Sequence, residues 1–223
     1  MRMPLGILAV VALLLVAFLG FAPPPDPDLV RPRTDLPWQV TGNPDGSSRV
    51  FDLQLGTATL AEAIAKFGPV EAMALFEPAA GPLALEAFFG NVRLGPLNAK
   101  VVVGLAASDD ELRGLRDASR KREGSPSGDW KYSVDDSAAK HAGRRLTAIT
   151  YIPSTRGLDA DFFRERFGEP SAWRQENENA VTWFYPQSGL TVLIDDRARE
   201  VLEYQAPRDF VMPDGVTRNP AVR

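Results

Sequence analysis

Residues Asp159–Pro170, with the sequence DADFFRERFGEP, contain the pattern that decides the fold. Asp159 is a typical helix N-cap, because its carboxylate can accept a hydrogen bond from a backbone N–H of the first turn. Phenylalanines at positions 162, 163 and 167 then give the segment an apolar side. Gly168 and Pro170 mark its end, since glycine is common just after a helix and proline cannot continue one. The segment therefore predicts a short helix that packs through its phenylalanines.

Strand candidates lie on both sides of this helix. One precedes it, and four follow it, separated in part by the turn-forming triplets NEN and QSG. They are Arg145–Ile152, then Ala172–Glu176, Ala180–Tyr185, Leu190–Asp195 and Glu200–Tyr204. Because the strands after the helix follow one another through short connections, they predict an antiparallel sheet against which the helix packs.

The first half of the chain repeats this order of elements. Thr59 with Glu62 three residues later forms a capping box, and apolar residues at helical spacing lead to Phe67-Gly68. The strand candidates around this helix are Arg49–Leu55, Val70–Glu77, Leu83–Phe89 and Lys100–Leu105. Because Phe67-Gly68 and Phe167-Gly168 occupy equivalent places, we predict two tandem units, each a helix packed on an antiparallel sheet.

The predicted fold class is α+β, and the chain divides into five parts. A second capping box, Ser108 with Glu111, predicts a charged helix that runs toward Glu123. The loop GSPSGD that follows is typical of a boundary between units. The predicted parts are a membrane anchor (1–22), a proline-rich linker (23–48), the first α+β unit (49–124), the second α+β unit (125–206) and a C-terminal tail (207–223).

The second half also resembles a known superfamily. Its motifs are a helix, then Phe167-Gly168-Glu169-Pro170, the aromatic strand Trp183-Phe184-Tyr185, the segment Gly189–Asp195, and Val201. This order resembles the superfamily that contains the β-lactamase-inhibitor protein and the small lipoprotein of the outer-membrane assembly machinery. The resemblance covers residues 158–204 well and 59–105 loosely. It implies helices on an antiparallel sheet and a function in binding other proteins.

Two departures from the superfamily pattern concern the anchor and one turn. The chain has no cysteine, so it cannot carry the lipid of the lipoprotein and would use its hydrophobic helix instead. The turn after Asp195 reads Asp196-Arg197-Ala198, where these relatives usually have glycine. Partner-contacting residues of the superfamily do not map onto this sequence one by one.

The N-terminal segment Leu5–Ala22 is uncharged and predicts a transmembrane helix. Its 18 residues would span about 27 Å at about 1.5 Å each, close to the thickness of the hydrocarbon layer. A cleaved secretory signal is the alternative, with small residues at Gly20 and Ala22. We favour an uncleaved anchor, because a cut there would leave Pro23 as the first residue and the apolar stretch is long for a signal.

The flanks of this helix bear on orientation and on the linker. Arg2 precedes the helix, whereas Arg31 and Arg33 follow it farther away, so we favour a cytoplasmic N-terminus. The predicted location is therefore the bacterial inner membrane, with a single pass and a periplasmic body. Pro23–Pro44 predicts an extended spacer, and a ligand for an SH3-like groove is the less favoured alternative.

Composition excludes several classes of function. The chain has 25 basic and 29 acidic residues, which argues against nucleic-acid binding, because that requires a basic surface. The absence of cysteine excludes disulfides, thiolate metal sites and cysteine nucleophiles. His141 is the single histidine, and we expect it at the surface. We therefore assign no catalytic, metal-binding or cofactor-binding residue and expect no cofactor.

Trp183 and Tyr185 are the candidate partner contacts, since aromatic side chains often anchor protein interfaces. Other candidates have plainer interpretations. Asp135-Asp136 and Asp195-Asp196 are expected in turns rather than at a metal. Glu77 and Glu86 could pair as acid and base if they lie close together. The basic residues of 113–122 could contact lipid headgroups, but interleaved acids favour a solvated helix face.

The predicted function is a membrane-anchored extracytoplasmic module that binds or assembles an unidentified protein partner without catalysis. Its predicted partners are the lipid bilayer, through Leu5–Ala22, and that protein. The alternative is an enzyme that uses aspartate or glutamate carboxylates. A deep pocket that gathers several acids with perturbed pKa values would favour the enzyme. A shallow, aromatic-rich sheet face would favour the binding module.

Overall fold

The computed structural model describes residues 34–79, 81–124, 128–134 and 137–222. The residues from Thr34 to the C-terminus form one compact unit. The predicted membrane helix at Leu5–Ala22 lies outside the described residues. Within the described ranges, no helix has both the length and the apolar character needed to cross a bilayer.

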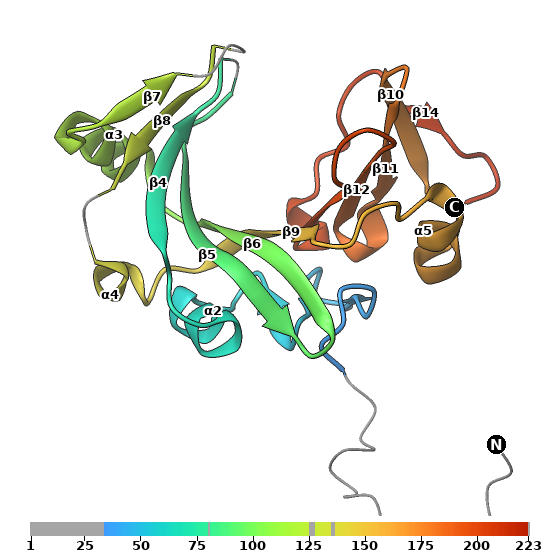
Figure 1. The fold of residues 1–223 in the computed structure, drawn as a ribbon, viewed down its shortest axis with the longest axis horizontal. Helices are drawn as coiled ribbons and strands as arrows, with labels where there is room; N and C mark the ends of the chain where they lie inside the picture. The colour runs from blue at the N-terminus through green and yellow to red at the C-terminus, as the bar shows by residue number, and fades with distance from the viewer. Residues whose placement is uncertain (1–33, 80, 125–127, 135–136, 223) are drawn as a thin grey trace, which may run out of the picture. The chain divides into compact units, whose positions relative to one another are not determined.

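An eleven-stranded antiparallel sheet forms the frame of this unit (Figure 1). The α+β class is therefore confirmed, with a large sheet and few helices among the described residues. In spatial order, the strands are β14 (Thr217–Arg218), β10 (Ala172–Asn177), β11 (Ala180–Tyr185), β12 (Leu190–Asp195), β13 (Val201–Gln205), β9 (Leu146–Pro153), β6 (Leu97–Leu105), β5 (Ala84–Leu94), β4 (Ala72–Glu77), β8 (Trp130–Ser133) and β7 (Arg122–Gly124).

Two helices precede equivalent sets of strands. α2 (Leu60–Phe67) leads into β4, β5 and β6, and α5 (Ala160–Phe167) leads into β10, β11 and β12. The spatial order is mirrored about the central pair β9 and β13, because β6-β5-β4 extends one way and β12-β11-β10 the other. The helices also end alike, since Gly68 has φ 97° and ψ −166° and Gly168 has φ 77° and ψ −168°.

α2 is fixed by its cap and by its aromatic end. The capping box is present, with Thr59 N donating to Glu62 Oε2 at 2.7 Å. Phe67 is buried. Its ring packs edge-to-face against Phe51 and Phe89, with ring centroids 5.7 Å and 5.5 Å apart. The prediction that Phe67 is structural is confirmed.

α5 is capped as predicted but packs less deeply. The Asp159 carboxylate accepts from Phe162 N at 2.9 Å. Phe163 is the buried residue of this helix, whereas Phe167 is half-buried. The Phe167 ring stacks 6.4 Å from Phe163 and lies 5.7 Å from Tyr185, so it serves packing as predicted.

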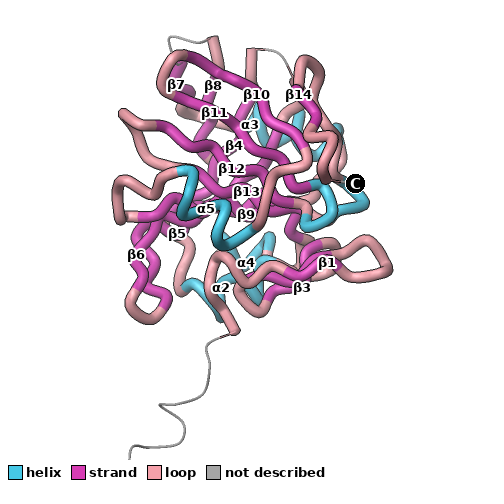
Figure 2. Tube along the Cα trace, turned by 90° about the vertical axis from the view of Figure 1, so that its right-hand side faces the viewer, coloured by secondary structure: helices cyan, strands magenta, loops and turns pink. Residues whose placement is uncertain are grey.

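The single strand predicted at Arg49–Leu55 is wrong, because this segment is a hairpin. Its strands are β2 (Ser48–Val50) and β3 (Leu53–Leu55), which join β1 (Thr41–Gly42) in a small separate sheet (Figure 2). Phe51 and Asp52 form the turn with φ of 54° and 62°, a conformation uncommon outside glycine. Burial of Phe51 between Tyr151 and Tyr204 offsets this strain.

The region between the two halves also differs from its prediction. α3 (Asp109–Ala118) has the expected capping box but ends five residues before Glu123. β7 and β8 then form a hairpin, and β8 pairs with β4 at the edge of the sheet. The predicted boundary at 124/125 therefore falls inside this hairpin. A short helix, α4 (Ala138–His141), follows it.

The body extends beyond both predicted ends. Residues from Thr34 to Ser48 were expected in the linker, yet Asp35 pairs with Lys66 at 2.9 Å and Pro37 O accepts from Tyr204 Oη at 2.7 Å. At the other end, the expected tail contains β14, which pairs with β10. The two 3₁₀ turns are η1 (Pro186–Ser188) and η2 (Pro207–Asp209).

The two faces of the large sheet are covered differently. α2, α3 and α5 all contribute to one core, on the outer side of the bending sheet in Figure 1. Strand residues that point to this side are buried, as Leu85, Val101 and Ile149 show. Their neighbours Glu86 and Thr150 point the other way and reach solvent. We call this second surface, on the central strands β5, β6, β9 and β13, the open face.

Candidate functional site

The two candidate partner contacts lie on the helix-covered side of β11 but differ in access. Tyr185 is buried, its hydroxyl donates to Gly168 O at 3.0 Å, and burial, followed by the nearby Glu169 charge, raises its pKa. It holds the end of α5 against the sheet and offers little surface to a partner. Trp183 is 7% exposed, and it forms part of the wall of a hollow.

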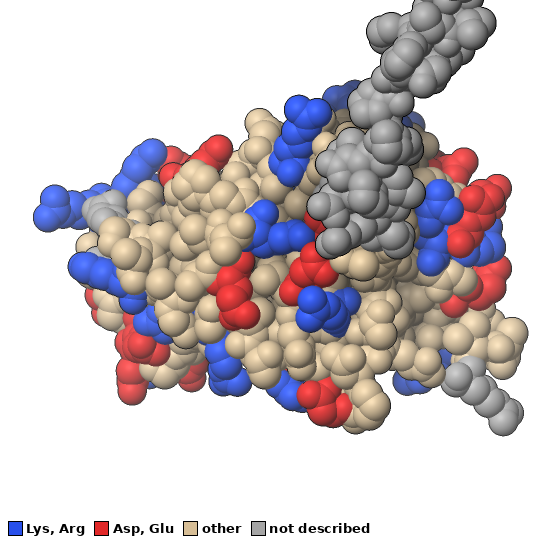
Figure 3. Space-filling model, turned by 90° about the horizontal axis from the view of Figure 1, so that it is seen from below, with Lys and Arg blue, Asp and Glu red and all other residues tan. Residues whose placement is uncertain are grey.

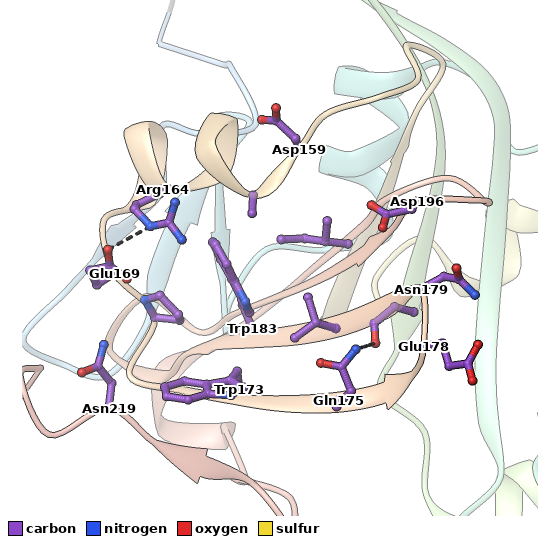
Figure 4. A pocket seen from close by; sticks show the side chains of 15 residues that line it. Asp159, Arg164, Glu169, Trp173, Gln175, Glu178, Asn179, Trp183, Asp196 and Asn219 are labelled. Atoms are coloured by element: carbon purple, nitrogen blue, oxygen red, sulfur yellow. Dashed lines mark hydrogen bonds and ion pairs between the residues drawn. The ribbon is translucent and has the colours of Figure 1, made fainter.

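This hollow, the tryptophan pocket, lies between α5 and the strands β10, β11 and β12 and has a volume of about 600 Å³ (Figure 4). Its side chains include Trp173 and Trp183, the amides of Gln175 and Asn179, and Arg164. Sequence reasoning identified Trp183 alone among these. The others were missed because their convergence depends on strand register, which the turn NEN does not specify alone.

The open face carries a second hollow, the sheet groove, with a volume of about 480 Å³. It is lined mostly by small or uncharged residues of the central strands, including Val102, Ala148 and Thr150. Glu86 on β5 and Glu203 on β13 are its two acids. The lining of the groove therefore consists mainly of uncharged side chains, together with two carboxylates.

Both carboxylates of the sheet groove have raised pKa values. Burial is the main cause for Glu86, the Glu203 charge adds to it, and Lys131 opposes it. For Glu203, restricted hydration at the floor of the groove raises the pKa although solvent reaches the side chain. A cation placed between them would favour the charged form of both.

The predicted acid and base pair, Glu77 with Glu86, does not form. Register places Glu86 beside Ala74 on the open face. Glu77 faces the covered side, where it accepts from Tyr132 Oη at 2.6 Å and from Arg116 Nη1 at 3.5 Å. Glu77 thus anchors α3 and β8 to the edge of the sheet.

His141 is buried, so the expectation of a surface histidine is wrong. Its Nδ1 accepts from Arg144 Nε at 2.9 Å, and Arg144 also donates to Ala106 O at 2.9 Å. Arg144 Nη2 reaches Glu111 at 2.8 Å, which, together with the capping contacts, lowers the pKa of Glu111 to about 2. This network ties α3 to α4 and has a structural role.

The remaining candidates behave as turn or surface residues. Asp195 Oδ1 accepts from the backbone of Arg197 at 2.8 Å and Ala198 at 3.0 Å, which confirms the turn. Asp135-Asp136 lies outside the described residues. No group of three potential metal ligands occurs within the described ranges. In the 113–122 segment, Arg113 and Arg116 pair with acids, as expected for a solvated helix.

Charges on the face shown in Figure 3 are interspersed, with Lys and Arg beside Asp and Glu. The tryptophan pocket is rich in aromatic and amide side chains, and the sheet groove in uncharged residues of the central strands. A search for relatives gives no further guidance, since the chain matches no protein-family model, no curated protein and no solved structure.

Proposed function

We propose that the chain is a membrane-anchored, extracytoplasmic protein-binding or assembly module that docks its partner on the open face. The observation that carries the proposal is the unequal covering of the sheet. Helices α2, α3 and α5 contribute side chains to the core on one side, whereas the sheet groove on the other is lined by residues of the central strands and, from the helices, by Leu112 of α3. Such a face leaves side chains of the central strands accessible to a partner.

The chemistry of the sheet groove specifies the kind of partner. Val102, Ala148 and Thr150 are short side chains, so a partner element can approach the strands closely. The half-buried Glu86 and the exposed Glu203 flank them, and both have raised pKa values. The complementary element is a narrow apolar loop or helix edge with one lysine or arginine, since its charge would pair with these carboxylates.

The tandem-unit architecture supports the proposal. We infer two repeated helix-and-sheet units from the mirrored strand order and from the similar conformations of Gly68 and Gly168. Such units are the architecture implied by the resemblance to the β-lactamase-inhibitor-protein superfamily, whose members bind other proteins. Trp183 and Tyr185 are buried on the helix-covered side of β11, so they lie outside the docking surface proposed on the open face.

Affinity capture tests the docking surface. Full-length protein is captured from detergent-solubilised membranes of its own cells, alongside Thr150→Arg, which places a long charged side chain in the centre of the groove. Glu165→Arg, on the exposed side of α5, is the matched control. We expect one stoichiometric partner with the wild type and the control, and its loss with Thr150→Arg. Equal recovery with all three, or no stoichiometric partner, contradicts the proposal.

Anchoring at the bacterial inner membrane, with a periplasmic body, is proposed from Leu5–Ala22. We expect the protein to sediment with membranes and to resist carbonate extraction, because an apolar helix of this length is stable in the bilayer. Mass spectrometry of the mature protein provides the control. A mature N-terminus at or after Pro23 would identify a cleaved signal and contradict the anchor.

The enzyme is a second candidate because Glu86 and Glu203 share one groove and both have raised pKa values. Their strands are separated by β6 and β9 in the sheet. Carboxylate pairs of glycoside hydrolases are about 5–9.5 Å apart, so a concerted acid and base requires the bend of the sheet to bring Glu86 and Glu203 within that range.

A further inference from the structure

The tryptophan pocket is separate from the open face, because it lies on the helix-covered side of the sheet. Its floor consists of two indoles on neighbouring strands. Trp173 on β10 is the direct register partner of Trp183 on β11, so both rings project from the same side of the sheet. Side chains of such partners start only about 4.5–5.5 Å apart. Figure 4 shows both side chains at the pocket, Trp183 between α5 and the sheet and Trp173 on the neighbouring strand.

A β-bulge creates this pairing. Asn177 pairs with Ala180 at the hairpin turn, but the register shifts by one residue between Gln175 and Asn177. Without the shift, Trp173 would oppose Phe184, whose side chain points to the other face. Bulges of this kind re-aim side chains and are common next to binding sites. The bulge therefore brings the two tryptophans together.

Planar amides border the aromatic floor. The amide of Gln175 is held by its Nε2, which donates to Asn177 O at 2.6 Å and Ala180 O at 3.1 Å. Its Oε1 accepts no hydrogen bond from the described part of the chain and remains available to a ligand. The neighbouring Asn179 is fixed through its backbone, since Asp196 N donates to Asn179 O at 3.0 Å. An amide offers a donor and an acceptor side by side, which matches adjacent hydroxyl groups.

The charges inside the pocket are already balanced by the protein. Arg164 Nε pairs with Glu169 at 2.9 Å, and its guanidinium lies 5.3 Å from the Trp183 ring centre. Asp159 is used in capping α5. Two exposed acids, Glu178 and Asp196, remain at the rim. Anions are disfavoured by these acids, and a cation would have to share the Trp183 surface with Arg164.

We propose that the tryptophan pocket binds a neutral saccharide, with one sugar ring stacked on the half-buried Trp173 and bordered by the edge of Trp183. The faces of pyranose rings present weakly positive C–H groups, which complement the negative faces of indoles. Hydroxyl groups at the ring edge would bind Gln175, Asn179 and the rim acids. A volume of about 600 Å³ lies within the usual range of about 300–1,000 Å³ for small-molecule sites.

Ala160 accounts for the opening of the pocket at the N-terminal end of α5. The equivalent residue of α2 is Leu60, which is fully buried, and the residue equivalent to Arg164 is Ile64. With alanine at position 160 in place of the leucine at position 60, the side chain at this point of α5 is short, and Ala160 lines the pocket together with Arg164 and Trp183. Ala160→Leu should therefore fill this part of the pocket without removing any proposed ligand contact.

Tryptophan fluorescence of the full-length protein, in a detergent without a sugar headgroup such as an amine oxide, tests the proposal. The probes are neutral gluco-, malto- and chito-oligosaccharides, each titrated to 10 mM. The variants are Trp173→Ala, Asn179→Ala and Ala160→Leu, with Trp130→Ala as control. Trp130 is 37% exposed on β8, at the other end of the sheet.

We expect saturable binding of at least one oligosaccharide that is insensitive to salt. Trp173→Ala and Ala160→Leu should weaken it at least about tenfold and Asn179→Ala severalfold, with Trp130→Ala unchanged. Far-UV circular dichroism confirms that each variant is folded. Absence of binding by all three sugar series overturns the proposal. So does binding of a lysine-rich peptide that is lost in salt and in Glu178→Gln, because it would identify a cation site.

Discussion

Helices α2 and α5 each precede antiparallel strands of the large sheet but differ in how many of their side chains are buried. α2 buries Leu60, Ala63 and Phe67, whereas α5 buries only Phe163. The helices align residue by residue at an offset of 100, so Leu60 corresponds to Ala160 and Ala63 to Phe163. A small residue at 63 lets α2 approach the sheet closely. The bulky Phe163 and the short Ala160 hold α5 differently and leave the tryptophan pocket.

A short helix that precedes strands of an antiparallel sheet can therefore either close against them or leave a hollow beside them. The choice depends on a few inward side chains and leaves the strand order unchanged. In the first unit the aromatic residues Phe51, Phe67 and Phe89 pack on one another. In the second, Trp173 is half-buried and lines the pocket beside the buried Trp183. Substitutions of these inward side chains test whether they cause the difference between α2 and α5.

The largest expected effect is Phe67→Ala. Its ring is 7% exposed, so truncation should destabilise the protein by about 3–5 kcal/mol and lower the Tm by about 6–20 °C. Phe167→Ala should cost less, about 1–3 kcal/mol, because its ring is half-buried. Thermal unfolding of full-length protein in detergent measures both. Equal costs would mean that the two helices are equally well sealed.

The next largest effect is expected for Leu60→Ala. It should lower the free energy of unfolding by about 2–5 kcal/mol, because it would open a cavity beneath α2. The reciprocal Ala160→Leu should change stability by less than about 1 kcal/mol, because the pocket already has room for the side chain. Differential scanning calorimetry distinguishes the two. A strongly destabilising Ala160→Leu would show that α5 is in close contact with the sheet at this point.

Gly68→Ala and Gly168→Ala should have intermediate and equal effects. Both glycines have positive φ with ψ near ±170°, a region almost restricted to glycine, and an added Cβ at either meets no atom within 4 Å. The cost is then backbone strain alone, about 1–3 kcal/mol each. Denaturant unfolding curves give both values. Clearly unequal costs would weaken the equivalence of the two helix ends.

The smallest effect concerns pH and Glu86, since its folded-state pKa is raised above the ordinary value. In the pH window between those two pKa values the folded state binds more protons, so stability falls as pH rises through the window. Glu86→Gln should therefore raise the Tm at pH 7 and leave it unchanged near pH 4. Glu178→Gln, on an exposed turn, is the control. The measured quantity is the Tm of Glu86→Gln minus that of the wild type. If this difference does not increase between pH 4 and pH 7, the assignment is contradicted.

Local patterns predicted much of the fold. Capping residues and Phe-Gly ends located α2 and α5, and alternating apolar residues located most strands of the large sheet. The hairpin at Phe51-Asp52 was missed because non-glycine residues with positive φ give no turn signal. β8 was missed because WKYS is too short to stand out, although pairing with β4 stabilises it.

The candidate sites were harder to predict because they depend on long-range register. Glu86 and Glu203 lie 117 positions apart in the sequence and share a groove only through the pairings of β5, β6, β9 and β13. Trp173 becomes the register partner of Trp183 through a β-bulge that no residue pattern predicts. Composition did identify Trp183 as a candidate contact, but its direction toward α5 followed only from the structure.

Site-specific photo-crosslinking in intact membranes tests the central claim, that the open face docks a protein, most directly. A photoreactive amino acid replaces Val102, in the sheet groove, or Glu165, on the exposed side of α5. The account predicts one discrete crosslinked protein at position 102 and none at 165. Identical products at both positions, or no product at 102, would contradict it.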